Sequence, residues 1–283
     1  LVIHCLYAGN GETLFSELAG NTAHVTSRVM SMNRNGLEYK KILLIGATSG
    51  IGAALAERYA ARTEKIAVTG RREDLLSAFC AKHPNACYGV VDVMQAHDAV
   101  VRLQQLVELM GGVDLIWLCA GVGTMNAQLD FEQEEPAIRT NVWGWTAISD
   151  WAYTLFERQG FGHLAVISSI AGTCGLFPAP AYAASKAYQI SYLESLRQRA
   201  FLAKKPIFVT DVRPGFVRTP LLGDKEPYVG IVSVDRVVPC MIRAVDRHRG
   251  VLIVPGRWKP VVWFMKLLPV RLLAWILGKL VSK

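Results

Sequence analysis

The spacing of three glycines constrains the fold of this chain more than any other feature. Gly46, Gly50 and Gly52 follow residues 41–45, a lysine and four apolar residues, which predict a short buried strand. The glycines open a helical pattern at residues 50–62. Glycine permits a tight turn and lets a phosphate approach the free N–H groups at a helix N-terminus. We therefore expect a strand–turn–helix unit that binds a nucleotide. An ordinary turn is the alternative, because the spacing is not Gly-x-Gly-x-x-Gly.

Further strand-like runs alternate with helical stretches along the chain. These runs occupy residues 65–69, 87–91, 113–118, 163–167, 206–212 and 251–254. Because consecutive parallel strands need a crossover, the alternation predicts an α/β fold, with a Rossmann-type doubly wound parallel sheet in a three-layer α/β/α arrangement. We expect one domain at residues 41–256 and a poorly ordered extension at residues 1–40.

Tyr182 and Lys186 predict an acid–base site. They stand four residues apart in Tyr-Ala-Ala-Ser-Lys, so a helix places both on one face. A tyrosine hydroxyl titrates near ~10 in water, and nearby positive charge is needed to favour the phenolate at neutral pH. Ser169, thirteen residues before Tyr182, could hydrogen-bond a carbonyl or alcohol oxygen, whereas Ser168 is interpreted as a packing residue. A solvated helix face is the alternative for the Tyr–Lys pair alone.

These motifs together resemble the short-chain dehydrogenase/reductase family, in the family's order, from about residue 41 to residue 254. The resemblance implies that Tyr182 is the general acid/base and that Ser169 orients the substrate oxygen. It implies that Lys186 lowers the tyrosine pKa and binds the nicotinamide ribose, and that Asn141 holds a water linking Lys186 to solvent. With Tyr182 and Lys186, the residues implied to bind the cofactor are Gly46, Thr48, Ser49, Gly50, Ile51, Gly52, Arg71, Arg72, Asp92, Val93, Ala120, Gly121, Pro214, Gly215, Val217 and Thr219.

Two positions depart from the family pattern. Cys119 stands where the resemblance places an asparagine, so a hydrogen bond between central strands loses its usual donor, and Ile45 stands where a threonine precedes the first glycine. A buried partner left unpaired costs roughly 1 to 3 kcal/mol. We expect Cys119 to be a buried small hydrophobe rather than a nucleophile.

The residues after the second strand predict the cofactor. Enzymes that use NAD usually place an acid there, which accepts hydrogen bonds from the ribose 2′-hydroxyl. This chain has Gly70, followed by Arg71 and Arg72, and a guanidinium suits the 2′-phosphate of NADP. We predict that NADPH is preferred over NADH, with Arg71 as the principal contact. The alternative is that both arginines begin a solvated helix at residues 71–82.

Cysteine and histidine usage predicts a reduced interior without a metal. The six cysteines form no Cys-x-x-Cys pair, and the six histidines are scattered rather than clustered. We therefore interpret the histidines as surface or strand-end residues rather than ligands. The apolar stretch at residues 1–8 is too short for a secretory signal and lacks the basic start of one. We therefore expect a cytoplasmic protein that is not secreted.

The C-terminal segment combines positive charge with apolar side chains. From residue 247 to residue 283 there are eight Lys or Arg and no acid, against a net charge of +8 for the whole chain. Lys266, Pro269 and Arg271 interrupt the apolar run, so residues 257–283 predict an in-plane amphipathic helix that contacts a membrane peripherally, rather than a transmembrane helix. Packing on its own domain or in an oligomer is the alternative. Charge confined to this tail argues against a nucleic-acid partner.

The substrate is predicted less sharply. Family geometry implies a loop at residues 216–233 that covers the substrate, and an apolar lining would suit a lipophilic ketone or alcohol. The resemblance also implies a homodimer or homotetramer paired through helices at residues 143–159 and 182–203. Other functions left open are an NAD-dependent alcohol dehydrogenase and a non-catalytic nucleotide-binding scaffold. The candidate lining residues are Ile170, Cys174, Phe177, Phe216, Leu221 and Leu222.

Overall fold

The computed structural model describes residues 32–33, 36–37, 39–222 and 230–281. The chain divides into two units, residues 1–38 and residues 39–283. In the first unit, β1 (Met32–Asn33) pairs antiparallel with β2 (Gly36–Leu37). The predictions for residues 1–31, and part of the loop expected to cover the substrate, lie outside the described residues.

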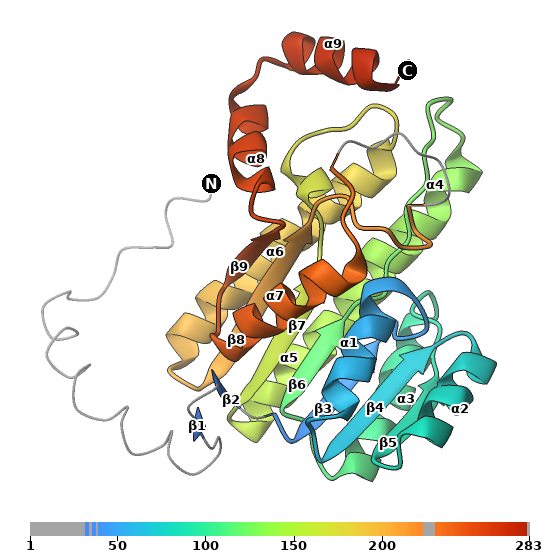
Figure 1. Cartoon of the computed structure of the whole chain (residues 1–283), viewed down its shortest axis with the longest axis vertical. Coiled ribbons are helices and arrows are strands. Elements are labelled where there is room, and N and C mark those ends of the chain that lie inside the picture. Colours follow the sequence, from blue (N-terminus) through green and yellow to red (C-terminus); the bar gives the residue numbers. More distant parts are fainter. Residues whose placement is uncertain (1–31, 34–35, 38, 223–229, 282–283) are drawn as a thin grey trace, which may run out of the picture. The chain divides into compact units, whose positions relative to one another are not determined.

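A seven-stranded parallel sheet forms the centre of the second unit, in the order β5-β4-β3-β6-β7-β8-β9 (Figure 1). Strand β6 begins two residues later than predicted, because the Asp114 carboxylate accepts hydrogen bonds from the N–H groups of Lys40 and Lys41 at 2.8 and 2.9 Å. The prediction of a doubly wound parallel sheet is confirmed. The strands are β3 (Lys41–Ile45), β4 (Lys65–Gly70), β5 (Ala86–Val90), β6 (Leu115–Leu118), β7 (Gly162–Ile167), β8 (Ile207–Pro214) and β9 (Val251–Val254).

Helices cover both faces of this sheet. On one face, apolar side chains of α3, α5 and α6 pack with strand residues into the main core, which contains Trp145 and Phe156. On the other face, α1 packs against α7. The helices are α1 (Gly50–Ala60), α2 (Glu73–Lys82), α3 (Ala96–Met110), α4 (Phe131–Ile138), the π-helix η2 (Arg139–Gly144), α5 (Trp145–Gln159), the 3-10 helix η3 (Ile170–Thr173), α6 (Pro180–Ala203), α7 (Val234–Asp246), α8 (Trp258–Leu267) and α9 (Val270–Val281).

Of the histidines predicted to lie at the surface or at a strand end, His163 lies near the start of a strand but is buried. It is fully buried at the start of β7, where one ring nitrogen bonds the Tyr39 hydroxyl at 2.7 Å and the other bonds the Thr210 hydroxyl at 2.8 Å. Burial holds the pKa of His163 well below its usual range, so the ring is neutral. Tyr39 is itself buried and donates to the Val245 carbonyl as well, which ties the beginning of the second unit to its core.

The C-terminal segment forms two helices, not the single helix that was predicted. The break falls at Leu268 and Pro269, because Pro269 has no N–H to continue the hydrogen bonding of α8 and its ring restricts the residue before it. Val262 of α8 and Leu273 of α9 are buried, whereas Trp263 is 67% exposed. None of the described helices has the length and apolar character needed to span a bilayer.

Candidate active site

The glycine loop has little room for side chains. Gly46 has φ +88°, and a Cβ there would lie 2.6 Å from the Ala120 nitrogen. A Cβ on Gly52 would lie 2.0 Å from the Gly46 carbonyl oxygen, so the loop closes tightly onto the first turn of α1. Ser49 precedes that turn but accepts no capping hydrogen bond through its side chain, and the turn holds no acid. The N-terminus of α1 therefore offers N–H groups to an anion.

A cleft opens above this loop, at the carboxyl ends of the central strands. It holds 13 of the 18 residues predicted to bind the cofactor, together with Leu221 from the predicted substrate lining. Sequence reasoning missed Val122 and Thr140, whereas it singled out Gly70 as the position that lacks an acid. The cleft residues from the prediction are Gly46, Thr48, Ser49, Gly50, Ile51, Gly52, Arg71, Arg72, Asp92, Val93, Ala120, Gly121 and Thr219.

Two arginines border the cleft in different ways. Arg72 donates to the Thr48 hydroxyl from Nη2 at 2.7 Å and from Nε at 3.2 Å, so its guanidinium is fixed to the glycine loop. Arg71 is exposed and, among the described residues, has no hydrogen-bond or ion-pair partner. Gly70 lies under this pair, where a Cβ would come within 2.7 Å of Thr48. The cleft thus has one anchored and one available cation.

Ser169, Tyr182 and Lys186 meet beside the cleft. Ser169 follows the end of β7 and accepts a hydrogen bond from the Ala171 nitrogen at 3.0 Å, and its hydroxyl lies close enough to the Tyr182 side chain to lower the tyrosine pKa. Tyr182 and Lys186 lie one turn apart on α6, with the Lys186 ammonium 5.9 Å from the centre of the tyrosine ring. A Cβ on Gly123 would lie 2.5 Å from that ring, so glycine is needed there for the tyrosine to pack.

Burial shifts the pKa of both Tyr182 and Lys186. Burial raises the pKa of Tyr182 above its ordinary value, and the hydrogen bond from Ser169 only partly opposes this. Burial lowers the pKa of Lys186 to about 8, although Asp211 and Cys119 act in the opposite direction. The Lys186 ammonium donates to the Ile167 carbonyl at 3.1 Å, so it points to the end of β7. In this state Tyr182 carries its proton and is suited to act as an acid.

Gln189 is a buried site residue that sequence reasoning missed. Its Oε1 accepts from the Lys186 ammonium at 2.9 Å, and its Nε2 donates to the Asn141 carbonyl at 2.9 Å. An amide side chain therefore joins Asn141 to Lys186, where the family resemblance implies a water. The signal was present in the sequence, because Gln189 follows Lys186 by three residues and shares its helix face.

Asn141 lies in the π-helix η2, a form that often occurs at functional sites. Its side chain bonds both backbone groups of Val122, accepting at 3.0 Å and donating at 2.7 Å. It also donates to the Ser185 hydroxyl at 3.0 Å. Asn141 therefore fixes the strand end after β6 to α6, which holds Gly121 next to Lys186.

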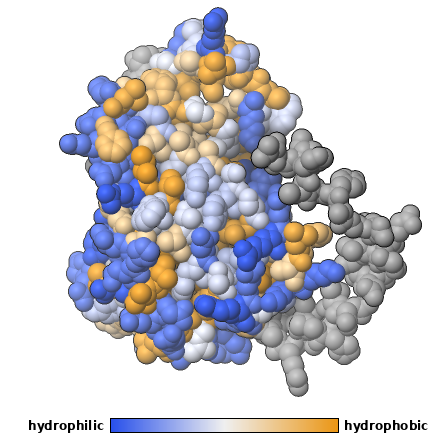
Figure 2. All heavy atoms as spheres, turned by 180° about the vertical axis from the view of Figure 1, so that it is seen from behind, coloured by the Kyte–Doolittle hydropathy of each residue, from blue (hydrophilic) through white to orange (hydrophobic). Residues whose placement is uncertain are grey.

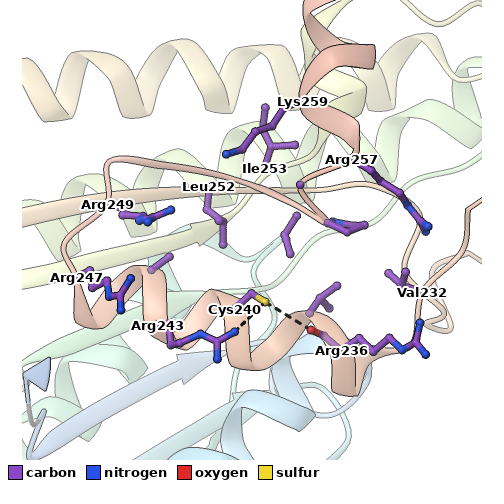
Figure 3. Close-up of a pocket in the computed structure, with 15 residues that line it drawn as sticks. Val232, Arg236, Cys240, Arg243, Arg247, Arg249, Leu252, Ile253, Arg257 and Lys259 are labelled. Atoms are coloured by element: carbon purple, nitrogen blue, oxygen red, sulfur yellow. Dashed lines mark hydrogen bonds between the residues drawn. The ribbon is translucent and has the colours of Figure 1, made fainter. Parts of the chain in front are cut away.

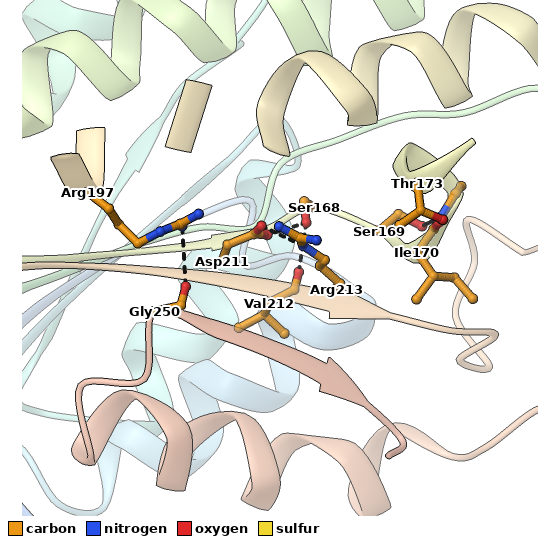
Figure 4. A network of polar contacts seen from close by, with 10 residues as sticks. Ser168, Ser169, Ile170, Thr173, Arg197, Asp211, Val212, Arg213 and Gly250 are labelled. Atoms are coloured by element: carbon orange, nitrogen blue, oxygen red, sulfur yellow. Dashed lines mark hydrogen bonds and ion pairs between the residues drawn. The ribbon is translucent and has the colours of Figure 1, made fainter. Parts of the chain in front are cut away.

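Ser168 corrects another prediction, because it is part of a buried polar network rather than a packing residue (Figure 4). Its hydroxyl donates to the Asp211 carboxylate, which also accepts from Arg213 Nε at 2.7 Å. Asp211 is fully buried and Arg213 nearly so. Arg197 of α6 donates to the Gly250 carbonyl at the edge of this network. A buried carboxylate thus bonds the residue that precedes Ser169.

Five residues predicted to bind the cofactor lie outside the cleft itself, namely Tyr182, Lys186, Pro214, Gly215 and Val217. Pro214 ends β8, and Gly215 packs against Trp258 of α8, whose Nε1 would lie 2.3 Å from a Cβ at position 215. Phe216 contacts the same indole with ring centres 5.4 Å apart. The C-terminal helix therefore begins against the loop after β8.

The remaining predicted residues are spread around the site. Ile170 lies in η3, Cys174 follows it and is half-buried, and Phe177 is exposed. Cys119 is partly exposed and lines the cleft, and burial raises the pKa of its thiol to about 12, which makes it a poor nucleophile. No group of three potential ligand side chains (His, Cys, Asp or Glu) converges on a metal position within the described residues.

Comparison with known proteins places the chain in a family. Residues 40–228 match the family model for short chain dehydrogenase. An uncharacterized oxidoreductase of Mycobacterium tuberculosis is 33% identical over 248 residues, which is 84% of this chain and 97% of that protein. A protein of Arabidopsis thaliana named 11-beta-hydroxysteroid dehydrogenase-like 2 is 30% identical over 241 residues, 80% of this chain and 77% of that protein.

Solved structures share the fold. A short chain dehydrogenase/reductase from Burkholderia phymatum in complex with NAD superposes with a TM-score of 0.73 at 19% identity, over 82% of this chain and 94% of that one. A short-chain dehydrogenase from Sphingobium yanoikuyae in complex with NADPH gives a TM-score of 0.71 at 23% identity, over 81% and 96%. The family model covers well over half of the chain, and it agrees with the ordered motifs and the sheet. The chain therefore belongs to the short-chain dehydrogenase family.

Proposed function

We propose that this protein is an NADP(H)-dependent oxidoreductase that moves a hydride between a nicotinamide and a carbonyl or alcohol. One observation carries the proposal: Ser169, Tyr182 and a buried Lys186 meet beside a cleft formed around a glycine loop. A protein that only binds a nucleotide has no need of a buried ammonium next to a tyrosine and a serine. The arrangement suits reduction, since the tyrosine is protonated.

The cleft residues fit a dinucleotide. Gly46 and Gly52 let the loop close tightly where a Cβ would clash with backbone atoms, and the uncapped N-terminus of α1 suits a pyrophosphate. Gly70 leaves the second strand without a carboxylate, and Arg71 is available to pair with a 2′-phosphate, while Arg72 supports the loop through Thr48. These features favour NADP over NAD.

The protein's own residues would handle the proton and the substrate oxygen. When bound, the nicotinamide supplies or accepts the hydride. Tyr182 donates its proton to the carbonyl oxygen, and the Ser169 hydroxyl hydrogen-bonds that same oxygen and holds it in place. Lys186, held by Gln189 and the Ile167 carbonyl, provides the positive charge that stabilises the phenolate after proton transfer.

We infer that the substrate is a lipophilic ketone or secondary alcohol. Phe216, just after β8, contacts Trp258 at the start of α8, and Leu221 borders the cleft. The name of the Arabidopsis relative is consistent with this class. The test is oxidation of NADPH and NADH by purified protein with hydrophobic and polar carbonyls, followed by absorbance. Turnover with NADPH and a hydrophobic ketone is expected. A preference for NADH would overturn the proposed cofactor, and turnover of small sugars alone would overturn the proposed substrate class.

We also propose peripheral membrane contact through α8 and α9. One side of these helices packs on the protein through Val262 and Leu273, which supports the packing alternative as well. Other apolar side chains remain exposed, and hydrophobic residues gather at the end of the molecule that carries α8 and α9 (Figure 2). The exposed side chains are Val261, Trp263, Phe264, Leu267, Val270, Leu272 and Trp275.

The chain is further proposed to form a homodimer or homotetramer through α5 and α6. Phe201 and Leu202 near the end of α6 are 84% and 76% exposed, which is unusual for adjacent large apolar side chains. Light scattering should give a mass of two or four chains, and Phe201→Glu should lower it. A monomeric wild-type protein would refute this assignment.

A further inference from the structure

A basic groove lies at the edge of the sheet, between α7, β9 and the start of α8 (Figure 3). It encloses about 470 Å³, and its floor is apolar, with Val237, Ala244 and Leu252 among its residues. Six exposed cationic side chains line it. They are Arg236, Arg243, Arg247, Arg249, Arg257 and Lys259, and together with the floor they are called the basic groove.

These cations lack carboxylate partners in the described part of the chain, where none of the six takes part in an ion pair within 4.0 Å. The acids of α7 are used elsewhere: Asp235 pairs with Arg58 on α1, and Asp246 pairs with Arg62 in the turn just after α1. Helix α7 therefore directs its acids toward α1 and its arginines toward the groove. Like charges in a concave site create a positive potential that attracts anions.

The groove continues into the exposed side of α8. Lys259 lines the groove, and Trp263 and Lys266 follow it at positions i+4 and i+7, so the three share one helix face. Trp263 and Lys266 are both exposed. In α9, the Lys279 ammonium lies 4.1 Å from the centre of the Trp275 ring. Tryptophan and lysine side by side are typical of the boundary between lipid headgroups and acyl chains.

The charge of the groove disfavours a second copy of the chain as its occupant. Strand β9 is an edge strand, and such an edge can pair with another chain. A two-fold interface would bring the same patch against itself, so arginines would face arginines. A nucleic acid would match the charge, but it would leave the apolar side chains of α8 and α9 in water. An anionic bilayer matches both surfaces, because its headgroups carry negative charge for the basic groove and its acyl chains accept the apolar side chains of α8 and α9.

We propose that the basic groove binds the phosphate-bearing headgroups of an anionic lipid bilayer while the exposed side chains of α8 and α9 enter the headgroup boundary. The inference rests on the membrane contact proposed above and adds a defined headgroup site to it. Because Trp258 at the start of α8 packs on Gly215 and Phe216, this docking directs the loop after β8 toward the lipid. A lipophilic substrate would then reach the site from the membrane side.

The test is flotation of the full chain with vesicles of phosphatidylcholine, with and without phosphatidylserine, at low salt. The variant R243Q/R247Q/R249Q should bind the anionic vesicles more weakly by on the order of 100-fold, because each cation near an anionic surface contributes roughly fivefold. Its binding to pure phosphatidylcholine should not change. The variant K82Q/R102Q/R158Q, with the same charge removed from α2, α3 and α5, should stay close to wild type.

Two comparisons separate the groove from the tail. The variant W263S/F264S should lose binding to both kinds of vesicle, since it removes apolar insertion. If the groove variant binds anionic vesicles like the charge-matched control, the headgroup site is refuted while the tail contact stands. If wild type binds neither vesicle, both are refuted. The groove variant could instead lose binding of inorganic phosphate while its binding to vesicles stays unchanged. That result would assign the groove to a soluble phosphate compound and overturn the lipid proposal. NADPH binding reports that each variant is folded.

Discussion

Replacing Asp211 with asparagine tests how the buried network supports Lys186. Asp211 is fully buried and Arg213 is 11% exposed, with 2.7 Å between Arg213 Nε and the carboxylate. Exposed ion pairs contribute only up to ~1 kcal/mol, but removing one partner of a buried pair costs roughly 3 to 5 kcal/mol, because the other charge is left without compensation. For a domain of this size, the loss corresponds to a fall in Tm of roughly 6 to 20 °C.

The same change should also move the pH dependence of activity. In the wild type, burial lowers the pKa of the Lys186 ammonium to about 8, and the negative charge of Asp211 acts in the opposite direction by favouring the charged form. Removing the negative charge makes the ammonium less favourable, so the pKa of Lys186 falls. The alkaline limb of the kcat/KM profile should therefore shift to lower pH in Asp211→Asn.

A second variant separates the two effects. In D211L/R213M both charges are replaced by apolar side chains of similar size, which removes the uncompensated arginine and should restore much of the stability. The alkaline limb should remain shifted, because the carboxylate is still absent. Thermal unfolding and pH profiles with NADPH measure both quantities. The account of this network would be refuted if Asp211→Asn were as stable as wild type. It would also be refuted if the alkaline limb did not move in either variant.

Other changes give results of definite sign. Gln189→Leu removes an acceptor from Lys186 and should shift the alkaline limb to lower pH, whereas Gln189→Glu should shift it to higher pH; equal profiles would deny Gln189 a positioning role. Arg71→Ala should weaken NADPH more than NADH, by roughly tenfold or more for a lost charged hydrogen bond, and Arg72→Ala should weaken both through the loop; titration of both nucleotides decides. Gly46→Ala places a Cβ 2.6 Å from a backbone nitrogen at φ +88° and should abolish nucleotide binding, so binding near the wild-type level would contradict the described loop.

The sequence predicted regular elements well where one physical signal dominated. Residues 42–45 and 251–254 are continuous apolar runs, and both strands, residues 41–45 and 251–254, have the predicted bounds. The glycine spacing likewise predicted the loop, because few other residues tolerate the approach of Gly52 to the Gly46 carbonyl. Periodicity and backbone sterics are local properties, so a sequence displays them directly.

Other features depended on contacts between distant segments. The burial of His163 follows from Tyr39 and Thr210, which are remote in sequence, and the role of Ser168 follows from Asp211 on the adjacent strand. Nothing local in Asn141 indicates that a π-helix carries it. The pairing of acids on one side of α7 and arginines on the other likewise becomes visible only when α1 and β9 are in place. Polar networks of this kind cannot be predicted from spacing alone.

The most direct test of the proposed function compares wild type with Tyr182→Phe in a single turnover. Both proteins are saturated with NADPH, mixed with the fastest carbonyl of the panel, and followed by the absorbance of the reduced nicotinamide. If Tyr182 donates the proton, the variant should bind NADPH as wild type does but oxidise it at least ~100-fold more slowly, as expected for loss of a general acid. Oxidation at the wild-type rate with NADPH still bound would contradict the assignment of Tyr182.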